Sequence, residues 1–76
     1  MRVFLLSCVD KETGHDMVLS ECSYNAACRW LMDKGFTDPT KTSITDGGRY
    51  TTLTFTQPRE RTFVYDELRG YLLATR

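Results

Sequence analysis

Four residues of the types that bind soft metals or act as nucleophiles stand in the first half of the chain: Cys8, His15, Cys22 and Cys28. Structural zinc usually draws on closely spaced pairs such as C-x₂₋₄-C, and no such pair occurs. Cys22 and Cys28 would lie nearly opposite each other along a helix. We therefore interpret the cysteines as buried thiols of a reducing compartment, and we expect no metal and no cofactor.

General acid–base chemistry has one candidate pair, His15 with Asp16. Their side chains adjoin in a predicted turn and diverge once a strand begins, so they are poorly placed to share a proton. Nothing in the spacing ties this single histidine to a thiol, and the other carboxylates are scattered. We expect no catalytic residues and no enzymatic activity.

Asp46-Gly47-Gly48-Arg49 contains paired glycines, which can cradle phosphate in some loops. The Lys-Ser/Thr pair that follows a phosphate loop is missing, and no strand-to-helix context surrounds the glycines. The segment instead predicts a tight hairpin turn.

Arginine and aromatic residues suggest binding surfaces. Arg49, Arg59 and Arg61 stand near Tyr50 and a threonine-rich strand, a combination with which some sheets hold unstacked RNA bases. Ten Lys and Arg balance ten Asp and Glu, however, and zero net charge is poor for phosphate binding. Trp30 flanks a predicted apolar helix face, where it is either a core-rim residue or an anchor for a partner protein.

The elements that position these residues begin with a helix over 24–34. Ser23 is a good N-cap, and Gly35 supplies the stop, with Phe36 placed to contact Leu31 in a Schellman-type end. The apolar face of this helix is formed by Tyr24, Ala27, Cys28 and Leu31.

Strands are predicted over 2–9, which should be central, and over 16–21. A hairpin follows over 42–45 and 50–57, with Ile44, Leu53 and Phe55 pointing inward. Residues 62–65 fit either an edge strand or a helix start, and residues 66–72 show helical spacing. The predicted fold class is α+β, with a small antiparallel sheet of about four strands, one central helix and a C-terminal helix, in the order ββαββ(β)α.

A chain of 76 residues supports one compact domain over 1–76. Hydrophobic residues make up 41% and charged residues 26%, as in a folding globular chain. No stretch reaches the length of a membrane helix, and the N-terminal segment lacks a signal-peptide cleavage site. We expect a soluble, cytoplasmic protein that does not bind membranes.

Compact α+β chains of this kind resemble, at the level of fold alone, the small accessory proteins of bacteriophages and mobile elements. Several of those inhibit host anti-phage defence, CRISPR complexes included. This resemblance implies a non-enzymatic inhibitor or regulator in the bacterial host cytosol, bound to a host protein or ribonucleoprotein complex.

The contacts we expect for such an inhibitor are Trp30, Arg49, Tyr50, Arg59 and Arg61. The alternatives are an RNA- or DNA-binding domain that uses the Thr/Arg/Tyr sheet face, and an oligomer that binds a nucleotide signal. A homodimer paired along residues 62–65 is a further expectation.

Overall fold

The computed structural model describes residues 9–75 and has five strands and one α-helix in this range. The chain runs through β1 (Asp16–Leu19), α1 (Tyr24–Asp33), β2 (Lys41–Thr45), a 3₁₀ turn η1 (Asp46–Gly48), β3 (Tyr50–Phe55), β4 (Arg61–Asp66) and β5 (Tyr71–Ala74). The α+β class is confirmed. The ten-residue α1 is too short to cross a membrane, and no other α-helix occurs in residues 9–75.

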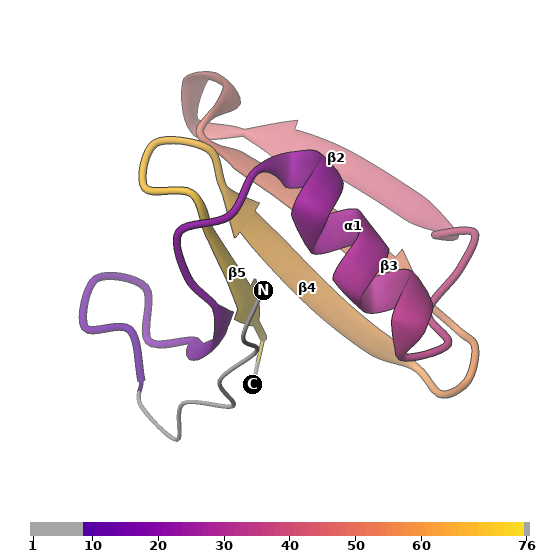
Figure 1. Cartoon of the computed structure of the whole chain (residues 1–76). Helices are drawn as coiled ribbons and strands as arrows, with labels where there is room; N and C mark the ends of the chain where they lie inside the picture. The colour runs from indigo at the N-terminus through magenta and orange to yellow at the C-terminus, as the bar shows by residue number, and fades with distance from the viewer. Residues whose placement is uncertain (1–8, 76) are drawn as a thin grey trace.

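The strands form one antiparallel sheet in the order β1-β5-β4-β3-β2. The three C-terminal strands are joined as a meander, and α1 crosses one face of the sheet (Figure 1). The opposite face carries no helix among the described residues. Alternation along each strand therefore sorts the side chains into a helix face and an open face.

The ends of α1 follow the local signals in the sequence. Ser23 accepts a hydrogen bond from the Ala26 amide at 3.1 Å, so the predicted N-cap is confirmed. At the other end the Phe36 amide donates to the Leu31 carbonyl at 2.9 Å, and Gly35 adopts a φ of +90°. These contacts form the predicted Schellman-type end.

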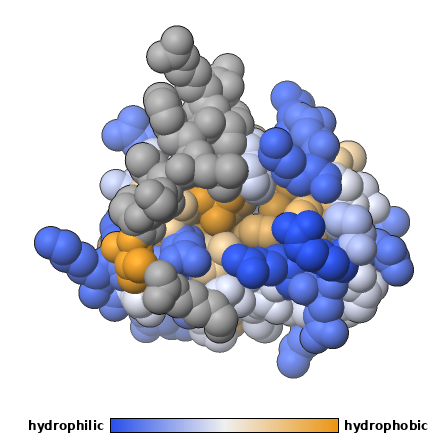
Figure 2. Space-filling model, turned by 90° about the horizontal axis from the view of Figure 1, so that it is seen from below, coloured by the Kyte–Doolittle hydropathy of each residue, from blue (hydrophilic) through white to orange (hydrophobic). Residues whose placement is uncertain are grey.

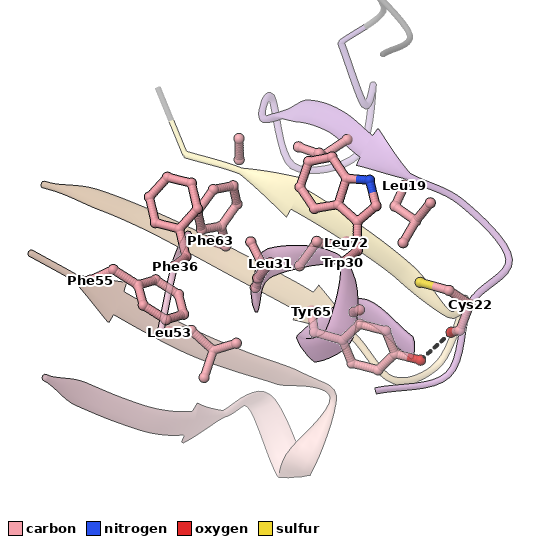
Figure 3. Close-up of a cluster of buried hydrophobic side chains, with 13 residues drawn as sticks. Leu19, Cys22, Trp30, Leu31, Phe36, Leu53, Phe55, Phe63, Tyr65 and Leu72 are labelled. Carbon is pink, nitrogen blue, oxygen red and sulfur yellow. Dashed lines mark hydrogen bonds between the residues drawn. The ribbon is translucent and has the colours of Figure 1, made fainter. Parts of the chain in front are cut away.

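The core lies between α1 and the helix face of the sheet (Figure 3). Leu31 and Ala27 point from α1 toward the sheet and are almost fully buried. The strands contribute Leu53, Phe55, Phe63, Tyr65, Leu72 and Ala74. Three phenylalanines, Phe36, Phe55 and Phe63, meet edge to face with centroids 5.1–6.0 Å apart.

The predicted C-terminal helix is wrong. Residues 67–70 form a turn in which Gly70 has a φ of +68°, and Tyr71–Ala74 continue as β5. The Gly70 amide donates to the Asp66 carbonyl at 2.7 Å, which closes the β4–β5 hairpin. Turn chemistry therefore overrides the helical spacing of Leu68, Tyr71 and Leu72, and Leu68 is 75% exposed.

Residues 62–65 belong to β4, which lies between β3 and β5. The prediction that this segment is an edge available to a two-fold mate is therefore wrong. The prediction that Ile44 points inward is also wrong, because β2 is an edge strand of the sheet and Ile44 is 68% exposed. The strand predicted over 2–9 falls almost wholly outside the described residues, and Val9 forms an isolated bridge with Asp16.

Candidate functional site

A groove of about 380 Å³ lies at the end of the molecule where α1 terminates. It opens between α1, the start of β4 and the ends of β1 and β5. We call it the basic groove, and it is lined by Val18, Trp30, Lys34, Phe36, Arg59, Arg61, Phe63 and Ala74. The view from below in Figure 2 shows hydrophobic surface bordered by strongly hydrophilic side chains at this end.

The cations of the groove come from α1, the β3–β4 loop and the start of β4. Trp30 and Lys34 are one helical turn apart on α1, so they lie on the same side of the helix. Arg59 belongs to the loop between β3 and β4, and Arg61 begins β4. Arg61 and Phe63 are two residues apart on one strand and share its helix face.

Each cation of the basic groove lies over an aromatic ring. Lys34 Nζ is 5.5 Å from the centroid of Trp30, and the Arg59 guanidinium carbon is 5.4 Å from that of Phe36. The Arg61 guanidinium carbon lies 6.0 Å from the centroid of Phe63. Cation–π contacts of this kind are worth about 0.5–1 kcal/mol at exposed sites, and they align the cations along an apolar floor.

Lys34, Arg59 and Arg61 make no salt bridge within the described part of the chain. Glu60 stands between the two arginines in sequence and is exposed, yet it pairs with neither of them. The basic groove therefore presents positive charge that the described residues do not neutralise.

Trp30 forms a wall of the groove and part of the core at once, with 8% of its surface exposed. In residues 9–75, its Nε1 is the buried side-chain polar atom that lacks a hydrogen-bond partner. Figure 3 shows this nitrogen on the Leu19 side of the ring, away from Phe36. The core-rim interpretation of Trp30 is thus the one that its burial supports, and any contact with a partner would use the ring.

Arg49 and Tyr50 lie elsewhere, next to the turn between β4 and β5. Arg49 donates from Nε and Nη2 to the two oxygens of Asp66, at 3.2 and 3.1 Å, and its Nη2 also lies 2.8 Å from Glu12. The same guanidinium stacks over Tyr50, with its central carbon 4.9 Å from the ring centroid. Arg49 is therefore engaged within the fold.

Asp66 is the centre of this ion cluster and is completely buried. Arg69 Nε donates to it at 2.7 Å and reaches Asp10 with its two terminal nitrogens, at 2.8 and 2.7 Å. Burial alone raises the pKa of Asp66, but hydrogen bonds from Arg49 and Arg69 outweigh that effect and lower it. The pKa of Asp10 is lowered mainly by its hydrogen bonds with Arg69.

A second hollow, of about 220 Å³, lies on the open face and is lined by Thr13, His15, Thr45, Tyr50, Thr52 and Val64. This is the threonine-rich face considered for nucleic acid. Alternation along β4 places Arg61 on the helix face, opposite to Thr62. The arginines expected to accompany that face are therefore either on the other side of the sheet or paired with carboxylates.

Cys22 and Cys28 are free thiols, and burial raises the pKa of Cys22. Cys8 lies outside the described residues. Within residues 9–75, no group of three or more His, Cys, Asp or Glu side chains is placed to hold a metal ion.

Sequence reasoning selected Trp30, Arg59 and Arg61 as candidate contacts but did not select Lys34 or Phe36. The spacing of Lys34 from Trp30, one helical turn, was the available signal. No local sequence pattern predicts the ion cluster that joins Asp10 to Asp66 and Arg69, because its members come from distant parts of the chain.

Comparison with protein-family models, curated proteins and solved structures finds no match to this chain.

Proposed function

We propose that this chain is a non-enzymatic protein-binding regulator that uses the basic groove to hold an acidic surface of its partner. The observation that carries the proposal is the contrast between two sets of cations. Arg49 and Arg69 are paired with buried or half-buried carboxylates, whereas Lys34, Arg59 and Arg61 have none within residues 9–75.

Residue type supports a protein partner. Trp and Arg are enriched among the residues that dominate binding energy at protein interfaces, where aromatic surface excludes water around a charged contact. In the basic groove Arg59 and Arg61 lie against Phe36 and Phe63. The rings therefore exclude water from one side of any carboxylate that pairs with these arginines. An open groove between α1 and the sheet suits a binding surface.

The kind of regulator follows from the fold-level resemblance to small phage and mobile-element proteins. On that basis the partner is a protein or ribonucleoprotein complex of a bacterial host, for example a CRISPR or other anti-phage defence complex. A bacterial lysate is therefore the source from which to capture it.

The test is affinity capture with the tagged full chain from nuclease-treated bacterial lysate, followed by mass spectrometry. The variant Arg59→Glu/Arg61→Glu reverses two groove charges. Its matched control, Arg29→Glu/Lys41→Glu, makes the same change in net charge at two exposed cations outside the groove.

We expect the wild-type chain and the control variant to capture the same partner and the groove variant to lose it. Equal recovery by the two variants would contradict the proposal. Recovery of nucleic acid with no groove-dependent protein, from a parallel lysate left untreated with nuclease, would instead support the nucleic-acid alternative.

A further inference from the structure

Resting on the proposed function, we infer that the partner segment held in the basic groove carries one large apolar side chain flanked by carboxylates. The groove has two chemically different parts, a floor and a rim. A ligand that satisfies both must itself be apolar at its centre and anionic at its edges.

The floor is formed by side chains that also belong to the core. Val18, Phe36, Phe63 and Ala74 line the groove, and each is at most 6% exposed. These four side chains carry no polar atom, so an apolar side chain is the group that gains by covering the part of them that stays exposed. A purely acidic segment would leave this surface wet.

The rim is formed by Lys34, Arg59 and Arg61, which lie over three different rings. Each cation lies over its own ring, so positive charge borders the apolar floor at the side chains of α1, the β3–β4 loop and β4. Separate carboxylates match this arrangement, and arginine pairs with carboxylate through planar, two-pronged hydrogen bonds.

A phosphate fits the same place less well. Phosphate sites in proteins commonly use free backbone amides at the N-terminus of a helix, where the helix dipole is positive. Here α1 ends, with Lys34 as its C-cap, and the Lys34 amide already donates within the helix. The zero net charge of the chain adds no long-range attraction for a polyanion.

The test is NMR titration of the full ¹⁵N-labelled chain with three short synthetic peptides. They share Gly/Ser flanks and differ at the centre, which is Glu-Phe-Glu, Gln-Phe-Gln or Glu-Ser-Glu. The readouts are the backbone amides of Phe36 and Phe63 and the indole N–H of Trp30, the single tryptophan of the chain. Inorganic phosphate and an oligothymidylate are titrated in parallel.

We expect the Glu-Phe-Glu peptide to bind at least about tenfold more tightly than either relative, because each of those lacks one of the two required features. Its shifts should vanish in Arg59→Glu/Arg61→Glu and persist in Arg29→Glu/Lys41→Glu. Equal affinity for the three peptides would overturn the inference, and so would tighter binding of phosphate or oligothymidylate at these residues.

The chain itself exposes Glu67 next to Leu68, so a second copy could supply similar chemistry. Shifts at the groove that grow with protein concentration in the absence of peptide would therefore overturn the assignment to a different protein. If no peptide binds while capture from lysate still depends on Arg59 and Arg61, the inference fails and the proposed function stands. If capture is independent of both arginines, the proposed function itself fails.

Discussion

Arg69 and Asp10 are 59 residues apart in the sequence and meet in a two-pronged ion pair, with nitrogen–oxygen distances of 2.8 and 2.7 Å. The pair ties the loop before β1 to the turn between β4 and β5. Arg69 also donates to the buried Asp66, so its guanidinium bridges Asp10 and Asp66. Both arginines of this cluster pair with carboxylates of the fold, whereas the three cations of the basic groove pair with no carboxylate among the described residues.

Asp66→Asn should lower the free energy of unfolding by about 3 kcal/mol, because it leaves Arg49 and Arg69 facing a neutral side chain in a half-buried place. Both arginines keep roughly a fifth of their side-chain surface exposed, at 20% and 23%, which holds the loss to the lower end of the usual range. Urea unfolding measures it. Asp33→Asn, at an exposed helix position, is the control and should change stability by less than about 0.5 kcal/mol.

The pKa values of Asp10 and Asp66 lie below the ordinary value of 3.8 in the folded chain. Their contribution to stability is therefore complete above that value and is lost as the pH falls below it. Urea unfolding at several pH values should show that Asp10→Asn makes the acid-induced loss of stability below about pH 4 shallower than in the wild type. Parallel curves for the two proteins would show that the ion pair does not lower the pKa of Asp10.

Leu53 and Ile44 lie on the same face of the sheet, but α1 covers β3 and leaves β2 uncovered. Leu53 is 2% exposed and Ile44 is 68% exposed. Leu53→Ala should cost about 2–5 kcal/mol of unfolding free energy, and Ile44→Ala less than about 0.5 kcal/mol. Thermal unfolding of the two variants side by side checks the position of α1, and comparable losses would contradict it.

Gly70→Ala and Gly14→Ala both place a side chain at positive φ, +68° and +76°. That conformation alone costs about 1–2 kcal/mol. A Cβ at position 70 would also lie 3.1 Å from the Cys22 carbonyl oxygen, which accepts the hydroxyl of Tyr65, whereas one at position 14 meets nothing within 4 Å. Chemical denaturation should therefore find Gly70→Ala the less stable of the two, and the reverse order would contradict the packing of this turn.

The elements that could be predicted from sequence are those with short-range signals. Ser23, Gly35 and the Asp46–Arg49 turn act on neighbouring backbone groups, so α1 and the β2–β3 hairpin follow from local chemistry. The apolar residues of the C-terminal segment suit either a helical or a strand period, so the sequence alone predicts a helix there. The turn at Gly70 and the pairing of β5 with both β1 and β4 make that segment a strand.

The candidate site was predicted in part. Trp30, Arg59 and Arg61 were chosen as residue types, and their meeting in one groove depends on how the β3–β4 loop packs against the end of α1. Arg49 was indistinguishable from Arg59 in sequence. The difference between them is a buried carboxylate, Asp66, that is brought to Arg49 by the register of β3 with β4.

The most direct test of the account is the dissociation constant of the purified captured partner for three proteins, measured by isothermal titration calorimetry. The account predicts that Arg59→Glu/Arg61→Glu weakens binding by about 100-fold or more, since two charge-assisted contacts are lost. It predicts that the dissociation constant of Arg29→Glu/Lys41→Glu stays within about threefold of the wild-type value, because exposed charges outside an interface act weakly. Equal weakening by the two variants would contradict the basic groove as the binding site.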